Sequence, residues 1–208
     1  DLVRSRGLGD VYKRQRTGEA IIIDPVRDLS KYIEVADSEG LTITQATETH
    51  IHADFASGIR DVAKRLNANI YVSGEGEDAL GYKNMPSKTQ FVKHGDIIQV
   101  GNVKLEVLHT PGHTPESISF LLTDLGGGSS VPMGLFSGDF IFVGDIGRPD
   151  LLEKSVQIKG STEISAKQMY ESVQNIKNLP DYVQIWPGHG AGSPCGKALS
   201  LIHISEPT

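Results

Sequence analysis

The sequence predicts a layered α/β (α+β) domain in which helices cover the faces of β-sheets. Three observations lead to this fold class. Short strand-like runs recur along the chain, two segments have helical periodicity, and turns containing Gly or Pro separate them. The chain has 208 residues, which is enough for one domain with a hydrophobic core of its own.

The first half of the chain begins with a short apolar strand. Ala20–Ile23 reads AIII and ends at Asp24-Pro25, which predicts a buried strand followed by a turn. Leu41–Thr47 alternates β-branched with polar residues, and Asn69–Ser73 is strand-like again. Between these two strands, apolar residues at helical spacing predict one face of a helix: Phe55, Ile59, Val62, Ala63 and Leu66.

The second half of the chain predicts a run of strands and one long helix. The strands are expected at Asp96–Val100, Val103–Val107, Ser117–Leu122, Met133–Phe142 and Tyr182–Trp186. The helix is expected over Ser161–Leu179, because Pro180 stops it. Its expected apolar face consists of Ala166, Met169, Tyr170, Val173 and Ile176.

The two ends of the chain share an unusual relation. Ser5–Gln15 reads SRGLGDVYKRQ, and the complementary strand of its back-translated DNA encodes LSLIHISEPTR, which contains the sequence of Leu199–Thr208. Such DNA resembles a transposon-based sequencing-library adapter. We therefore expect residues 1–15 and 199–208 to be adapter-derived and not native, and residues 16–198 to be a partial domain. A missing sheet edge would leave core surface exposed, so we expect this fragment to be poorly stable.

Composition narrows the classes of partner. Acidic residues outnumber basic ones, 26 to 20, giving a net charge of −6 without a basic stripe, which argues against nucleic acid. No apolar run approaches the roughly 20 residues needed to cross a membrane. The one cysteine, Cys195, excludes an internal disulfide framework and suits a reducing, cytoplasmic compartment.

Histidines and aspartates follow several of the expected strands. His50, His52 and Asp54 form the motif H-I-H-A-D directly after a strand. Alternate residues of an extended segment point the same way, so we expect these three side chains to converge on one point. Alone, each of these residues is more often a surface or capping residue than a ligand.

Three further strand ends carry the same chemistry. His113 lies in T-P-G-H-T-P, Asp139 in F-S-G-D-F and His189 in W-P-G-H-G. Together with the H-I-H-A-D motif they predict a metal site, and imidazole and carboxylate ligands suit zinc or iron. His94 and His109 lie in a loop and within a strand, and we expect neither to bind metal.

The motifs T-H-I-H-A-D, H-T-P-G-H-T, S-G-D and P-G-H, in this order, resemble those of the metallo-β-lactamase superfamily. The resemblance implies an αββα sandwich, incomplete here, so that residues 16–198 would be a partial metallo-β-lactamase-fold domain. The sequence is most similar to the persulfide dioxygenase branch, and within it to bacterial persulfide dioxygenase–sulfurtransferase fusions. This likeness includes Val143–Leu152 (VGDIGRPDLL) and Pro187–Lys197 (PGHGAGSPCGK).

The likeness to persulfide dioxygenases implies an enzyme with one Fe(II) per chain, held by His50, His113 and Asp139. Its substrates would be dioxygen and a low-molecular-weight or protein persulfide, which it would oxidise to sulfite in sulfide detoxification. A rhodanese-like domain would follow and form thiosulfate, and we expect a homo-oligomer.

Five more residues receive expected roles around that centre. His52, Asp54 and His189 would be catalytic, orienting the ligands or moving protons. Arg148 would hold an anionic part of the substrate, or order a loop through a salt bridge to Asp145 or Asp150. Cys195 would carry a persulfide at the substrate site, or be a small buried residue.

Phe55 separates the two main functional hypotheses. Dinuclear hydrolases of this superfamily have histidine directly after the aspartate of HxHxD, where this chain has Phe55. The change favours one metal over two. The alternative is a thioester hydrolase of the glyoxalase II kind with one or two zinc ions. A non-enzymatic sulfur carrier or scaffold is a further alternative, against which the intact His50, His113 and Asp139 argue.

Overall fold

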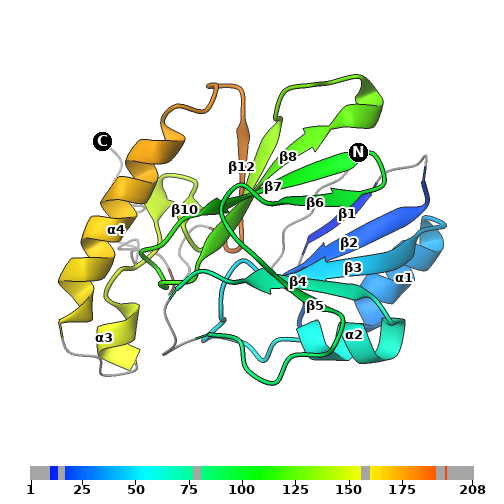
Figure 1. Ribbon diagram of the computed structural model, residues 1–208, viewed down its shortest axis with the longest axis horizontal. Coiled ribbons are helices and arrows are strands. Elements are labelled where there is room, and N and C mark those ends of the chain that lie inside the picture. The colour runs from blue at the N-terminus through cyan, green and yellow to red at the C-terminus, as the bar shows by residue number, and fades with distance from the viewer. Residues whose placement is uncertain (1–9, 14–16, 77–80, 156–159, 191–194, 196–208) are drawn as a thin grey trace, which may run out of the picture.

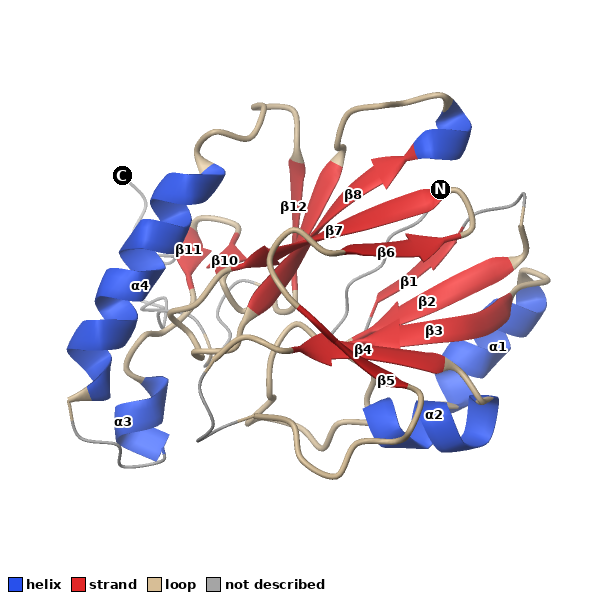
Figure 2. Ribbon diagram, in the orientation of Figure 1, coloured by secondary structure: helices blue, strands red, loops and turns tan. Residues whose placement is uncertain are grey.

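Two five-stranded sheets stack face to face in a computed structural model of the chain (Figures 1 and 2). The structure describes residues 10–13, 17–76, 81–155, 160–190 and 195. Helices lie on both outer sides of the stacked sheets, which gives the predicted αββα arrangement. Among the described residues, no helix is long and apolar enough to span a membrane.

The first sheet has the strand order β1-β2-β3-β4-β5, and its strands are β1 (Asp10–Lys13), β2 (Glu19–Ile23), β3 (Thr42–Thr47), β4 (Asn69–Ser73) and β5 (Thr89–Val92). Strands β2 to β5 are parallel, and β1 pairs with β2 in the antiparallel direction. Helices α1 (Ser30–Ser38) and α2 (Ile59–Leu66) connect the parallel strands and cover the outer face. The charges on α2 complement its helix dipole: the acidic Asp61 lies in the first turn, and the basic Lys64 and Arg65 lie in the last turn.

The second sheet has the order β12-β9-β8-β7-β6, and its strands are β6 (Ile97–Val100), β7 (Val103–His109), β8 (Ile118–Asp124), β9 (Gly134–Gly138) and β12 (Gln184–Pro187). Strands β6 to β9 are antiparallel neighbours, and β12 runs parallel to β9. A short 3₁₀ helix (Leu125–Gly127) follows β8, and a small hairpin of β10 (Ile141–Phe142) and β11 (Asp145–Ile146) follows β9. Helices α3 (Leu151–Ser155) and α4 (Ser161–Ile176) lie on the side away from α1 and α2.

Strand β2 contributes to two separate hydrophobic cores. Ala20 and Ile22 pack with residues of α1 and α2, whereas Ile21 and Ile23 pack between the two sheets. All four side chains are at most 2% exposed. A strand buried on both faces is a continuous apolar run without alternation, which explains the sequence AIII.

Two sequence expectations about secondary structure were wrong in detail. Met133–Phe142 is not one strand, because the chain turns at Asp139 and Phe140 between β9 and β10. The buried face of α4 is formed by Ser165, Met169 and Ser172, whereas Ala166 and Tyr170 are exposed. The helix is rotated from the expected orientation because it packs on a polar turn, where the Ser172 hydroxyl donates to the Pro111 carbonyl.

Part of the segment expected to lie outside the domain is in fact paired with it. The backbone of β1 (Asp10–Lys13) is aligned with β2 from Ile23 to Ala20. The expected adapter origin of residues 1–15 stays a prediction, but four of these residues extend the first sheet beyond β2. The range 199–208 lies outside the described residues.

The strand directions bring distant segments to one edge of the molecule. Strand β7 ends where β8 begins, and β9 and β12 end at the same edge because β9 is antiparallel to β8 and parallel to β12. The end of β3 is joined to this edge by a hydrogen bond from the Ile118 amide to the Thr49 carbonyl at 2.8 Å. The loops that follow β3, β7, β9 and β12 therefore meet.

Candidate metal centre

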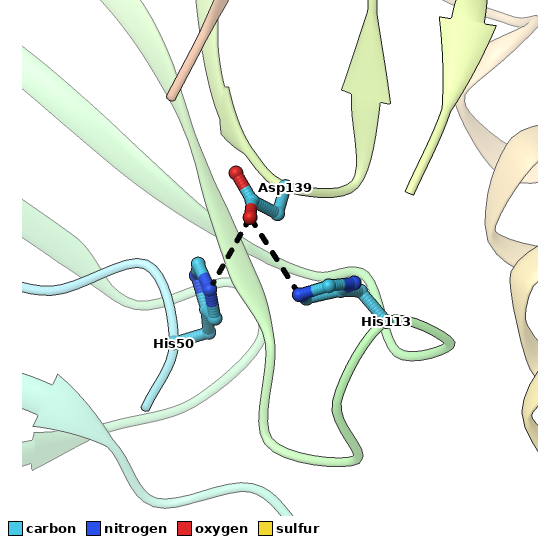
Figure 3. Close-up of side chains that lie close together, drawn as sticks. All are labelled: His50, His113 and Asp139. Carbon is cyan, nitrogen blue, oxygen red and sulfur yellow. Dashed lines mark ion pairs between the residues drawn. The ribbon is translucent and has the colours of Figure 1, made fainter. Parts of the chain in front are cut away.

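His50, His113 and Asp139 meet at this edge, although they are far apart in the sequence (Figure 3). Asp139 Oδ2 lies 3.7 Å from His50 Nε2 and 3.6 Å from His113 Nε2. All three residues are at most 2% exposed, and Asp139 Oδ2 has no hydrogen-bond partner in the described structure. A buried carboxylate oxygen without a partner is costly, and a shared ion about 2.1 Å from each ligand atom would satisfy it.

The protonation states of these groups suit metal binding. Burial holds the pKa of His50 well below its ordinary value and also lowers that of His113, so both imidazoles are neutral. Burial alone would raise the pKa of Asp139, but its hydrogen bonds with His189 and Cys195 and the nearby charges of His189 and His113 together outweigh burial, and the net pKa is lowered. Two neutral imidazoles and one carboxylate are the forms that coordinate a metal.

Hydrogen bonds on the far side of each ring define the tautomers. His113 Nδ1 lies 3.2 Å from the carbonyl oxygen of Arg148, which can only accept, so Nδ1 carries the proton. The Thr49 hydroxyl donates to Asp24 Oδ2 at 2.8 Å, and it therefore accepts from His50 Nδ1 at 2.9 Å. Both Nε2 lone pairs are left facing Asp139, as metal-binding histidines require.

We expect Thr49→Val to weaken metal binding by roughly 10- to 100-fold, the usual effect of removing a group that orients a ligand. Valine keeps the shape of threonine but cannot bridge Asp24 and His50. The measurement is competitive metal titration against a chelator. Thr49→Ser retains the hydroxyl and should bind metal like the wild type; equal loss in both variants would contradict the role of the hydroxyl.

Two carboxylates that support the centre, the partly buried Asp24 and the buried Glu116, were missed from the sequence. Asp24, in the turn after β2, accepts from the Thr49 amide and hydroxyl at 2.7 and 2.8 Å. Glu116 accepts from the Ile51 amide at 2.9 Å and the Thr114 hydroxyl at 2.8 Å, and so joins the loops that carry His50 and His113. In the sequence, Asp24-Pro25 had indicated only a turn, and Glu116 belongs to no motif that would mark it as part of a metal site.

His50, His52 and Asp54 are neighbours, but they do not converge on one point as expected, since His50 belongs to one group of potential ligands and Asp54 to the other. Residues after β3 form bends and not an extended strand, and His52 Nδ1 lies 4.0 Å from Asp54 Oδ1. His52 Nε2 lies 3.0 Å from Asp24 Oδ1, while the His52 ring lies 4.2 Å from that of His50. Burial alone would lower the pKa of His52, but the charge of Asp24, its hydrogen bond with His52 and the charges of Glu48 and Asp139 together outweigh burial, and the net pKa is raised.

His189 lies between two carboxylates at the mouth of the centre. Its Nδ1 is 2.6 Å from Asp139 Oδ1, and its Nε2 is 2.9 Å from Asp54 Oδ2. The hydrogen bond to Asp139 is the main reason that the pKa of His189 is raised to about 9, with Asp54 adding to it. An imidazolium whose two ring nitrogens both donate to carboxylates can carry a proton, and the catalytic role expected for His189 stays a prediction.

Arg148 and Cys195 both lie beside the centre. The Arg148 amide donates to the Cys195 carbonyl at 3.0 Å, and the Arg148 guanidinium binds both oxygens of Asp150 at 2.9 and 3.1 Å. The salt bridge to Asp150 was one of the two expectations for Arg148, and its role toward substrate stays a prediction. Cys195 is buried, at 8% exposed, and its thiol interacts with Asp139. This burial agrees with the second expectation for Cys195, a small buried residue, and its role as a persulfide carrier stays a prediction.

A second group of potential ligands adjoins the first. Donor atoms of Asp54, His189 and Cys195 lie within 4.8 Å of one another. Phe55 is not among them, and its ring stacks on His52 with a centroid distance of 4.2 Å. Phe55 precedes α2, which begins at Ile59. The helical spacing had suggested that Phe55 belongs to the apolar face of this helix, and that expectation was wrong.

His94 and His109 belong to neither ligand group of the described residues, and the expectation that neither binds metal stays a prediction. His94 Nδ1 accepts from the His109 amide at 3.2 Å, and His109 Nε2 lies 2.9 Å from the Pro115 carbonyl.

The fold and this centre define a metal-dependent enzyme class. Residues 11–189 match the metallo-beta-lactamase superfamily, and the chain belongs to that superfamily. It is 31% identical over 183 residues to a hydroxyacylglutathione hydrolase of Synechococcus sp., covering 88% of this chain and 62% of that protein. The chain thus spans somewhat less than two thirds of that relative's length.

Two solved structures have folds similar to that of this chain. A metallo-beta-lactamase from Staphylococcus aureus subsp. aureus COL is 71% identical with a TM-score of 0.84, covering 93% of this chain and 56% of that chain. ETHE1 from Myxococcus xanthus is 28% identical with a TM-score of 0.70, covering 94% of this chain and 77% of that chain.

Proposed function

We propose that this chain is the dioxygenase domain of a persulfide dioxygenase. It oxidises the terminal sulfur of a low-molecular-weight or protein persulfide to sulfite. The reaction balances as RSSH + O₂ + H₂O → RSH + SO₃²⁻ + 2 H⁺. The proposal includes a following rhodanese-like domain, a homo-oligomer and a cytoplasmic location.

This proposal rests on a difference in protonation state between the two groups of potential metal ligands. His50, His113 and Asp139 have the protonation states of ligands, whereas His189 is held as an imidazolium by Asp54 and Asp139. This favours one metal bound by two histidines and one carboxylate, the ligand set of non-haem iron oxygenases. The similarity to ETHE1 supports the same branch.

Bound iron would supply the change of oxidation state that oxygen chemistry requires and zinc lacks. His50, His113 and Asp139 would hold it. His189 bridges the buried Asp139 and the more exposed Asp54, so its Nδ1 and Nε2 protons connect the centre with solvent. It can carry away protons that sulfite formation releases. Cys195 lies close enough to Asp139 to take part as the protein persulfide.

A second candidate is a dinuclear zinc thioester hydrolase. The group of Asp54, His189 and Cys195 beside the first centre favours it, as does the similarity to hydroxyacylglutathione hydrolases. A second ion would have to displace the Nε2 proton of His189 and separate it from Asp54.

Oxygen uptake and metal content decide between these candidates. For protein purified anaerobically, we expect about one iron per chain. We also expect oxygen consumption that depends on added persulfide, measured with an electrode against a panel of low-molecular-weight persulfides. About two zinc ions per chain with thioester hydrolysis and no oxygen uptake would instead establish the hydrolase.

A further inference from the structure

A cavity of about 680 Å³ adjoins the centre on the side of His52. Its walls come from the loop after β3, the start of α2 and the segment at positions 81–85. The volume lies within the range of small-molecule sites. His52 lines the cavity, and its ring packs against that of His50 with a centroid distance of 4.2 Å, so a molecule bound there would lie one side chain away from a proposed metal ligand.

The cavity is lined by three cationic side chains, Arg27, Arg60 and Lys83, and by two acidic ones, Glu48 and Asp61, in a chain with a net charge of −6. Burial raises the pKa of Glu48 to about 7, which reduces its negative charge. Arg60 Nη2 donates to the Lys83 carbonyl at 2.6 Å, which holds these two segments together. Arg27 pairs with Asp61 at 3.4 Å. Among the described residues, no carboxylate pairs with Arg60 or Lys83, so both cations are available to an anion.

The inner wall combines apolar surface with a polar atom that makes no hydrogen bond. Ile51, Ile59 and Met85 line the cavity. The His52 side chain is 3% exposed, and its Nδ1 lies 4.0 Å from Asp54 Oδ1 without a hydrogen bond in the described structure. A ligand with an anionic end, an aliphatic body and a polar inner group would match all three features.

We propose that this cavity binds the anionic body of the thiol that carries the persulfide, with Arg60 and Lys83 holding its carboxylate or phosphate. The assignment rests on the proposed function, because it makes the ligand part of the substrate. The same chemistry would fit a separate organic or inorganic anion, and the experiment below distinguishes the two.

Binding is measured by calorimetry on the metal-loaded protein with glutathione, coenzyme A, inorganic phosphate and cysteamine, a thiol without an anionic group. Glutathione or coenzyme A should bind more tightly than phosphate or cysteamine. The double variant Arg60→Ala/Lys83→Ala should weaken that binding roughly 10- to 100-fold, since two charged contacts are lost. Arg65→Ala, on the same helix but outside the cavity lining, should bind like the wild type. Unchanged binding by the double variant would overturn the proposal.

Steady-state oxygen uptake separates this proposal from the proposed function. With an anionic persulfide, the double variant should raise KM roughly 10-fold, and more than it lowers kcat. Phosphate binding equal to that of glutathione, with KM unchanged, would assign the cavity to a separate anion and overturn the carrier assignment. Absence of oxygen uptake with every persulfide would refute the proposed function, while calorimetry would still report on the cavity.

Discussion

His113→Ala should abolish persulfide-dependent oxygen uptake and lower metal affinity by more than about 100-fold. Groups that only orient a ligand account for roughly 10- to 100-fold, so removing the ligand itself must cost more. The variant would remove the imidazole that lies 3.6 Å from Asp139 Oδ2 and leave that of His50 at 3.7 Å. Metal content by mass spectrometry and oxygen uptake by electrode are the measurements.

His94→Ala is the matched control for that experiment. His94 is a surface histidine outside the candidate ligand groups of the described residues, and its replacement should leave metal content and oxygen uptake unchanged. Circular dichroism should show native folding for both variants. Retention of stoichiometric iron by a folded His113→Ala protein would contradict the assignment of this ligand.

Gly147→Ala should be the most damaging conservative change near the centre. A Cβ at position 147 would lie 1.8 Å from the backbone oxygen of Asp139 and 3.2 Å from the Cβ of His113. Backbone cannot move aside as a flexible side chain can, so we expect a loss of roughly 3 kcal/mol in the free energy of unfolding. For a domain of this size that corresponds to a fall in Tm of roughly 6–12 °C.

Gly190→Ala serves as the control for this steric effect. A Cβ at position 190 meets no atom within 4 Å, and its φ is not in the left-handed region. Its Tm should therefore stay within about 1 °C of the wild type, in line with ordinary surface substitutions. The steric argument would be wrong if thermal melts of the two alanine variants coincided.

Hydrophobic periodicity predicted the strands that form the core, but it did not predict helix α1 or strand β5, which bury few side chains. Ala20–Ile23 and Asn69–Ser73 were located to within one residue, because buried strands have strong apolar patterns. Helix α1 (Ser30–Ser38) was missed because only Tyr32 and Ala36 are buried on it. Strand β5 (Thr89–Val92) was missed because it is a half-exposed edge strand.

The sequence by itself determined which residue types could bind a metal and the superfamily to which their spacing belongs. His50, His113 and Asp139 were expected as one set, and the structure brings them within 4.8 Å of one another. That expectation held because each ligand follows a strand, and strand ends that share one edge of the sheets bring their loops together.

Only the tertiary structure decided the roles of the surrounding groups. Asp24 and Glu116 lie 26 and 3 positions from the ligands they support, and nothing local in the sequence marks either as buried at the centre. His189 became an imidazolium only because folding places it between Asp54 and Asp139. Hydrogen-bond direction and desolvation depend on which atoms surround a side chain, and these neighbours come from segments that only the folded chain brings together.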